Sequence, residues 1–414
     1  MKKKKKKNNK FKKIIKELNT DSKFSIFEVV IIVFISNCFG VLVGYILTYT
    51  NSNINKIRND SNLEDIVVTY NEIVNNYYKD VDKKKLSEGA ISGMTSVLND
   101  PNTVYMNNNT TDVMKESLDG TFKGIGVTIQ YEDDYNKVIE VEKNGPADKA
   151  GLKKGDIILS IDGIDCKGLY GNKITKLIRD DSKSKIVIVV KRNEEEKKFT
   201  VTKDDIEIKS VSYRVFEEDN RKIGYIEISV FASNTSDQFN EALKKVEEKK
   251  IDSLIIDLRG NPGGYLDVAR KSLSMFFDKK TVLYQVVDKN SSKKKVYSLS
   301  NDKREYPIVL LGDASSASSS EVVISCFKDN YKDAIFIGET TYGKGTIQNS
   351  QSLKSGNNIK YTIDRWLTSK GKSIEGKGIS PDIEVKISDE YSEKPIMEND
   401  NQLQMALEEI KKNH

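Results

Sequence analysis

The stretch IVLLGDASSASSSEVVISCF, residues 308–327, decides the fold class. Ile308–Leu311 is apolar and predicts a short buried strand, and a helix is expected from about Ser320 to Lys328. Small residues between the two suit a tight turn, which places a serine at a helix N-terminus, where free N–H groups favour negative charge. A flexible serine-rich loop or a run of helix caps would use the same residues. The buried strand and the apolar run VVISCF argue against mere flexibility.

Strands and helices alternate on both sides of this stretch, over residues 221–385. Such alternation predicts a layered α/β domain. The expected strands are Ile223–Val230, Leu254–Leu258 and Ile335–Ile337, and the expected helices are Thr235–Glu248 and Tyr265–Phe277.

The loop DLRGNPGG, residues 257–264, follows the second of these strands. Pro262 keeps Asn261 extended, and the two final glycines permit a sharp turn that exposes backbone N–H groups. Such a turn can bind an oxyanion. Taken alone, the loop is more simply a strand–helix connection.

The loop GETTYGKGTIQ, residues 338–348, follows the last strand and holds Lys344 between two glycines. Most lysines lie on the surface, but a glycine-flanked lysine after a buried strand fits a positioned base better. A phosphate-binding loop is excluded by spacing, because Gly345 stands where that motif needs Ser or Thr.

The only histidine is His414. Catalysis by Ser-His-Asp or Cys-His needs an internal imidazole, and zinc hydrolases built on histidine ligands need several. These mechanisms are excluded, and no metal or cofactor is expected.

The cysteines Cys38, Cys166 and Cys326 form no CxxC pair, so Cys166 and Cys326 are interpreted as buried small apolar residues.

The net charge of +5 arises from one tail. Residues 1–18 hold ten Lys and one Glu, so the rest of the chain has a net charge of −4. No basic patch interleaved with aromatic residues follows, so nucleic acid is not an expected partner. The length of 414 residues suggests two or three domains.

Residues 29–47 contain no charged side chain. As a helix this run would span roughly 28 Å, close to the hydrocarbon thickness of a bilayer. The lysines before it predict an N-terminus inside the cell and a body outside. A cleaved signal peptide is the alternative, but the run is long for one and no A-x-A-like site follows. We therefore expect a retained transmembrane anchor over residues 24–50.

Residues 119–206 combine short Val- and Ile-rich strands with glycine turns and resemble a PDZ domain. KGIGV at 123–127 and GPADKAGLKKGDII at 145–158 carry the resemblance. The loop amides would bind a peptide carboxylate, and the peptide would add a strand to the sheet. A plain β-hairpin with glycine turns is the simpler alternative for GIGV alone. The peptide-binding residues would be Gly124, Ile125, Gly126 and Val127.

The ordered set of motifs resembles the carboxyl-terminal processing peptidase family. The resemblance extends over nearly the whole chain after the anchor. It rests on EGAISGMTSVLNDP, the PDZ segment, IGYIEISVFASNT, DLRGNPGG, SSASSSE, GKGTIQ and SKGKSIEGKGISPDIEV.

In that family a serine three residues before the Glu of the serine-rich run is the nucleophile, which implies Ser318 here. The resemblance makes Lys344 the base and Gln348 the residue that orients it. The implied oxyanion donors are the backbone N–H groups of Gly263 and Ser319. A free lysine is protonated at neutral pH, so Lys344 needs burial to lower its pKa before it can act as a base.

The implied fold is α/β, with a transmembrane helix, a helical segment, and a mainly β PDZ domain before a crotonase-like peptidase core. The expected segments are a basic cytoplasmic tail (1–23), the anchor (24–50), a linker and helical region (51–118), the PDZ domain (119–206), the core (207–388) and a helical tail (389–414).

The implied function is a membrane-anchored serine endopeptidase that cuts near the C-termini of exported proteins, with the PDZ domain binding substrate tails and able to gate activity. A homo-oligomer is left open. A catalytically silent PDZ adaptor at the cell surface is the alternative, and a structural envelope protein is a third interpretation.

Overall fold

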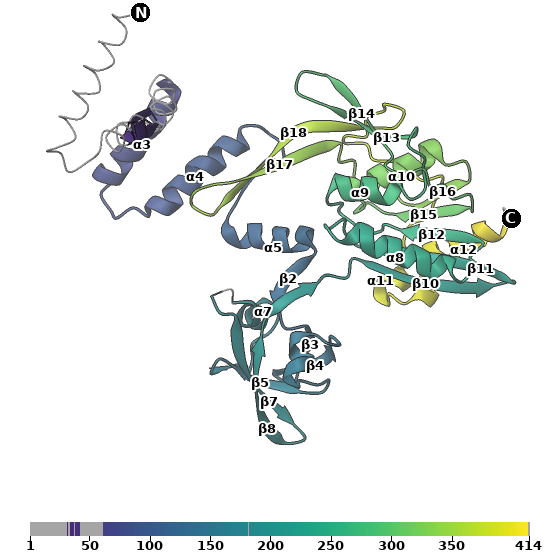
Figure 1. Cartoon of the computed structure of the whole chain (residues 1–414), viewed down its shortest axis with the longest axis horizontal. Helices are drawn as coiled ribbons and strands as arrows, with labels where there is room; N and C mark the ends of the chain where they lie inside the picture. Colours follow the sequence, from purple (N-terminus) through teal and green to yellow (C-terminus); the bar gives the residue numbers. More distant parts are fainter. Residues whose placement is uncertain (1–30, 32–33, 37, 42–60, 181, 413–414) are drawn as a thin grey trace, which may run out of the picture. The chain divides into compact units, whose positions relative to one another are not determined.

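The computed structural model describes residues 31, 34–36, 38–41, 61–180 and 182–412 (Figure 1). The expected basic tail and most of the expected anchor therefore lie outside the described residues. Within the described part, no helix is long and apolar enough to cross a membrane. The chain divides into two compact units, residues 1–94 and 95–414.

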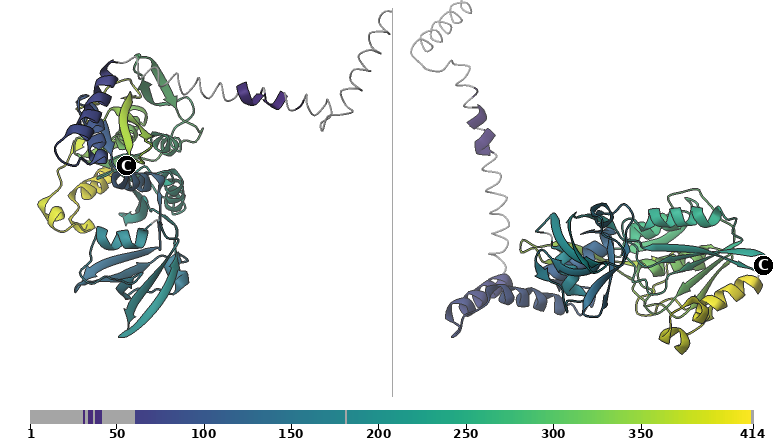
Figure 2. Two further views of the ribbon diagram at one scale, coloured as in Figure 1. Left: turned by 90° about the vertical axis from the view of Figure 1, so that its left-hand side faces the viewer. Right: turned by 90° about the horizontal axis from the view of Figure 1, so that it is seen from below.

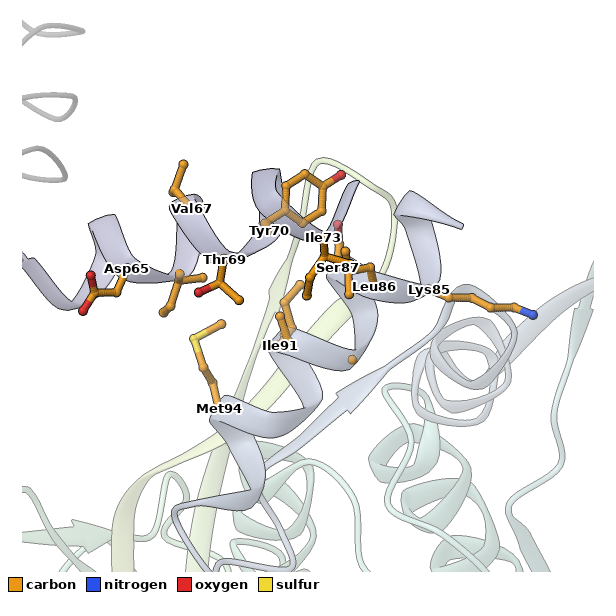
Figure 3. A pocket seen from close by; sticks show the side chains of 13 residues that line it. Asp65, Val67, Thr69, Tyr70, Ile73, Lys85, Leu86, Ser87, Ile91 and Met94 are labelled. Carbon is orange, nitrogen blue, oxygen red and sulfur yellow. The ribbon is translucent and has the colours of Figure 1, made fainter. Parts of the chain in front are cut away.

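In the first unit, two helices contribute apolar side chains to an open hollow of about 800 Å³ (Figure 3). Tyr70 and Ile73 come from the first helix, and Leu86, Ile91 and Met94 from the second. These positions follow the helical spacing seen in the sequence, and none of the candidate catalytic residues lines the hollow. The helices are α3 (Ser61–Asn76) and α4 (Lys83–Ser96).

The second unit begins with a short strand and a helix before the PDZ segment. The strand is unexpected in a region with a helical pattern; it forms because it pairs with a strand some 250 residues later in the chain. The two elements are β1 (Val104–Met106) and α5 (Asn108–Asp119).

The expected PDZ segment folds as an antiparallel sheet in the order β3-β4-β5-β7-β8, with β6 paired to β5. Its core is formed by inward-facing Ile and Val side chains, among them Val138, Ile158 and Ile188. A separate pair, β2–β9, joins the two ends of the domain. The strands are β2 (Thr121–Gly124), β3 (Val127–Glu132), β4 (Tyr135–Val141), β5 (Ile157–Ile161), β6 (Ile164–Asp165), β7 (Lys185–Arg192), β8 (Glu195–Thr202) and β9 (Asp204–Glu207), and the helices are α6 (Pro146–Ala150) and α7 (Asn172–Arg179).

The expected core segment is built on a sheet in the order β10-β11-β12-β15-β16-β19. All neighbours are parallel except β10 and β11. β12 and β15 are buried at every position, as expected for strands covered on both faces. The strands are β10 (Val211–Glu218), β11 (Arg221–Ile228), β12 (Ser253–Asp257), β15 (Ile308–Gly312), β16 (Ala334–Gly338) and β19 (Ile383–Glu384).

Helices cover both faces of this sheet, which gives three layers (Figure 2). Side chains of α8, α9 and α10 pack on one face, and Leu403, Ala406 and Ile410 of α12 pack on the other. The helices are α8 (Thr235–Glu247), α9 (Leu266–Leu273), α10 (Ser319–Asn330) and α12 (Asn401–Lys412); a short helix α11 (Asp389–Glu393) and a 3-10 turn (Met397–Asn399) precede α12.

A second, antiparallel sheet extends from the core and was not expected from the alternating pattern. Its long strand β18 pairs with β1, β13 and β17, and β13 also pairs with β14. Polar residues dominate β17, so hydrophobic periodicity does not reveal it. The strands are β13 (Val282–Val287), β14 (Lys293–Tyr297), β17 (Thr346–Ser352) and β18 (Asn358–Thr368).

Candidate active site

The three loops singled out in the sequence meet at one edge of the core sheet. β12, β15 and β16 are adjacent and parallel, with Asp257 paired to Leu311 and Gly312 paired to Gly338. Their carboxyl ends therefore lie side by side, which is where open α/β sheets place their sites. The loops that follow them hold Gly263, Ser318 and Lys344.

Ser318 stands at the N-terminus of α10 in a conformation unusual for a residue with a side chain. Its φ is 54° and its ψ is −112°. A non-glycine residue held in a sparsely populated region costs on the order of 1–3 kcal/mol and requires support from its surroundings. The Ser318 side chain is only partly buried.

The neighbouring serines are held differently. The hydroxyls of Ser316, Ser319 and Ser320 donate to backbone carbonyls of Leu258, Gly264 and Asn261, at 2.8, 2.9 and 3.0 Å. All three side chains are buried. Ser315 is exposed and lies earlier in the turn. Ser318 alone combines a partly accessible hydroxyl with the helix N-terminus.

Gly263 touches the turn that carries Ser318. A Cβ at Gly263 would lie 2.7 Å from Ala317 O and 2.9 Å from Ser318 Cβ, so no larger residue fits this approach. Its φ of +100° also favours glycine. The expected oxyanion donor therefore lies beside Ser318, but its N–H donates to Asn261 Oδ1 at 2.9 Å.

The second expected donor is the N–H of Ser319. It belongs to the first residue of α10, and the first N–H groups of a helix have no intrahelical partner. A Cβ at Gly263 would meet this nitrogen at 3.0 Å, so the Ser319 N–H lies beside the same turn.

Lys344 is anchored by its backbone, and its side chain is partly buried. Its carbonyl accepts from Trp366 Nε1 at 2.8 Å, and Trp366 N–H donates to Gly345 O at 2.8 Å. Burial lowers the pKa of Lys344 below the usual lysine value, and the nearby charge of Lys360 lowers it further. The carboxylates of Glu321, Glu375 and Asp100 oppose this shift without reversing it. A lowered pKa makes the neutral amine, the form that can accept a proton, easier to reach.

Glu321 joins the serine and lysine loops, and its role was missed in the sequence. Its fully buried carboxylate accepts from the backbone N–H groups of Ser318 and Lys344, both at 2.8 Å. It also accepts from Thr341 Oγ1 and the Gly343 N–H, both at 2.6 Å. An acidic residue within a buried helical segment is a signal for such a role, because a buried carboxylate needs partners.

Gln348 lies on β17 opposite Thr362 of β18. Its Nε2 donates to Thr346 Oγ1 at 2.9 Å and to Thr362 Oγ1 at 3.4 Å. Among the contacts of the described residues, none joins Gln348 to Lys344.

The predicted peptide-binding loop lies at the free edge of the PDZ sheet. Gly124 pairs with Asp204, Ile125 is buried, and Gly126 has a φ of +71°. Val127 starts β3, the end strand of its sheet, so an added strand has an unpaired edge to bind.

Comparison with known proteins tests the resemblance. Residues 222–385 match Peptidase family S41, residues 124–202 match the PDZ domain, and residues 46–110 match the "Activating protease CtpB N-terminal domain". A putative S41 protease of Bacteroides fragilis NCTC 9343 has a similar fold, with a TM-score of 0.50 at 16% identity over 82% of this chain and 92% of that one.

Two relatives are similar over most of the chain. The carboxy-terminal processing protease CtpB of Bacillus subtilis (strain 168) is 37% identical over 340 residues, which is 81% of this chain and 70% of the relative. A probable CtpA-like serine protease of Staphylococcus aureus (strain COL) is 35% identical over 350 residues, 83% of this chain and 69% of the relative. The family predicted from the motifs is thereby confirmed, and the silent adaptor is disfavoured. The chain belongs to the PDZ-containing carboxy-terminal processing peptidases of family S41 and is a serine-type endopeptidase.

Proposed function

We propose that this endopeptidase cuts proteins near their C-termini with Ser318 as nucleophile and Lys344 as general base. The observation that carries the proposal is the Glu321 carboxylate, which binds the backbone N–H of both residues at 2.8 Å. One buried group thus sets the position of both loops. The lowered pKa of Lys344 supports the role of base.

The chemistry follows from this arrangement. The neutral amine of Lys344 takes the proton of Ser318 Oγ as the oxygen attacks the substrate carbonyl. The oxyanion accepts from Ser319 N–H, and from Gly263 N–H if Asn261 Oδ1 releases that group. The Lys344 ammonium then protonates the leaving amine. Water, activated by the same lysine, hydrolyses the acyl-enzyme.

The masses of the products test where the enzyme cuts its substrate. The purified chain is incubated with a folded protein that ends in a flexible apolar tail, and the products are weighed by mass spectrometry. We expect a protein shortened within the tail, together with the matching small peptide. A silent adaptor would retain the substrate without shortening it. Cleavage spread through the body of an unfolded substrate, with no preference for the tail, would contradict C-terminal processing.

The PDZ domain is proposed to bind the substrate tail through the loop Gly124–Val127 and to gate the active site. The loop amides need a carboxylate, and the edge of β3 pairs with the peptide backbone. A peptide with a free C-terminal carboxylate should therefore bind more tightly than its C-terminal amide, measured by calorimetry on the full chain. Equal affinities would argue that the domain only packs against the core.

The chain is also proposed to be anchored in the cell membrane with its catalytic part outside. The ten lysines within residues 1–18 and the uncharged run 29–47 support this orientation. Protease treatment of intact, wall-stripped cells should digest the PDZ segment, while a cytoplasmic marker protein stays whole. A PDZ segment that remains protected under these conditions would overturn the topology.

A further inference from the structure

A chain of polar side chains runs from the strand beside Lys344 to a turn in the first part of the second unit. Asp100 precedes β1, and β1 pairs with β18, with Val104 opposite Lys360. This pairing brings Asp100 to Thr362 of β18, and Thr362 faces Gln348 of β17. Residues 244 or more positions apart in the sequence thus meet at β17 and β18.

Asp100 is the acceptor end of this chain. Its Oδ2 accepts from Thr362 Oγ1 and from Thr103 Oγ1, both at 2.6 Å, and its Oδ1 accepts from the Asn102 N–H at 2.9 Å. Burial raises the pKa of Asp100, but these hydrogen bonds and the charge of Lys344 outweigh burial and hold the pKa below the usual value. Asp100 is therefore ionised at neutral pH. Because a carboxylate can only accept, the Thr362 hydroxyl proton points to Asp100.

The direction of the Thr362 hydroxyl determines its hydrogen bond to Gln348. Because the hydroxyl proton is donated to Asp100, Thr362 Oγ1 can only accept from Gln348 Nε2, at 3.4 Å. Thr346 Oγ1 accepts from the same Nε2 at 2.9 Å, and it also accepts from Asn102 Nδ2 at 3.3 Å. Both threonines thus present oxygen lone pairs to Gln348, so its NH2 group is turned toward them. The carboxamide oxygen is left to accept from another donor.

We propose that Asp100 is a positioning residue for Lys344. Its carboxylate sets the direction of the Thr362 hydroxyl, and Thr362 in turn sets the orientation of the Gln348 carboxamide. The Gln348 oxygen is thereby left free to accept from the Lys344 amine, a contact that the described residues do not make in this structure. The inference rests on the proposed Ser318–Lys344 pair. The same carboxylate also faces the charge of Lys344: burial and Lys360 lower the pKa of Lys344, and Glu321, Glu375 and Asp100 oppose that shift.

The first test is Asp100→Asn in the full chain. Asparagine can donate to Thr362, so the hydroxyl proton is no longer directed and the Gln348 amide is free to turn over. We expect kcat to fall by about tenfold to a hundredfold, the order expected when a catalytic group is misplaced, with KM unchanged. The acid limb of the pH–kcat profile should also move to lower pH. Without the carboxylate the ammonium is less favoured, so Lys344 loses its proton at a lower pH.

Asp278→Asn is the matched control. Asp278 also accepts from a backbone N–H, that of Lys280 at 3.0 Å, and from a threonine hydroxyl, that of Thr281 at 3.1 Å. It stands in a turn outside the chain of contacts that leads to Gln348. Asp278→Asn should therefore leave kcat and the pH profile unchanged, even if it lowers the melting temperature.

Thr362→Val tests the next residue in this series of hydrogen bonds, the one between Asp100 and Gln348. The change removes the hydroxyl at nearly constant volume and should lower kcat about as much as Asp100→Asn. Thr362→Ser restores a hydroxyl and should recover most of the kcat lost in Thr362→Val. If Asp100 acts through Thr362, the double variant Asp100→Asn/Thr362→Val should be little slower than either single variant, because the two effects are not additive.

The results for these variants distinguish a failure of the role of Asp100 from a failure of the proposed Ser318–Lys344 mechanism. Folded Asp100→Asn and Thr362→Val that both keep wild-type kcat would overturn the inference. A lower melting temperature in Asp100→Asn with an unmoved pH profile would also overturn it. If Asp100→Asn does not fold, the kcat values of Thr362→Val and Thr362→Ser decide whether the inference holds. Lys344→Ala is assayed alongside: activity there would refute the pair itself, whereas an inactive Lys344→Ala beside unaffected Asp100→Asn refutes only the role of Asp100.

Discussion

Ser318→Ala should abolish peptide hydrolysis, with a loss in kcat/KM of roughly a thousandfold or more, as for the loss of other serine nucleophiles. Ser318 is partly accessible at the N-terminus of α10 and touches the Gly263 turn. No other serine of the run shares these features. The Ser318 backbone N–H still binds Glu321 after the substitution, so the fold should survive.

The other four serines of the run supply matched controls for this prediction. Ser316→Ala, Ser319→Ala and Ser320→Ala each remove a hydrogen bond to a carbonyl of the 257–264 loop, which costs about 1 kcal/mol of stability. Ser319→Ala keeps the backbone N–H that is proposed to bind the oxyanion, so its turnover should be retained. Ser315→Ala should change neither property.

The serine panel is scored by turnover of a tail-bearing substrate and by melting temperature. A folded Ser318→Ala that retains activity, while a neighbouring variant loses it, would show that the nucleophile has been assigned to the wrong serine of the motif.

Lys344→Ala should likewise abolish turnover, because the sequence holds no internal histidine that could replace the proposed base. Lys344→Arg is the sharper variant. Arginine keeps a positive charge on a long side chain but is not deprotonated in proteins, so it should be equally inactive. If Lys344 served only to hold a negative charge in the site, the arginine variant would keep much of its activity.

The pH dependence of the wild-type enzyme provides a second measure of the same group. Burial lowers the pKa of Lys344, and a lysine can act as a base only when it is neutral. The value of kcat/KM should therefore rise with pH and reach a plateau. The apparent pKa of this rise should be lower than the pKa of a free lysine. A rate that is flat from neutral to alkaline pH, together with an active Lys344→Ala variant, would exclude the lysine base.

Much of this molecule could be predicted because its signals are local. The apolar runs of β12, β15 and β16 and the glycine turns between them depend on residues close in sequence, and they are enough for an α/β core. The PDZ strands are marked in the same way. β17 and β1 could not be predicted from local patterns. Each is a strand because it pairs with β18, which is distant from β1 in the sequence.

Some features of the site needed tertiary contacts. The amino-acid sequence by itself determined the family, three loops that each follow a buried strand, and the exclusion of mechanisms that need an internal histidine. The pairing of the strands, which brings the three loops to one sheet edge, comes from the tertiary structure. Composition could not choose among five serines, which are chemically alike. The structure separates them by burial and hydrogen bonding, and it also shows that Asn261 binds the Gly263 N–H.

Glu321 and Asp100 illustrate the same limit. Glu321 binds residues 20 to 23 positions away, and Asp100 binds a threonine 262 positions away. Strand and helix periodicity arises from contacts between near neighbours in the chain. The partner of a buried carboxylate depends instead on which distant segments pack together, and only the tertiary structure decides that.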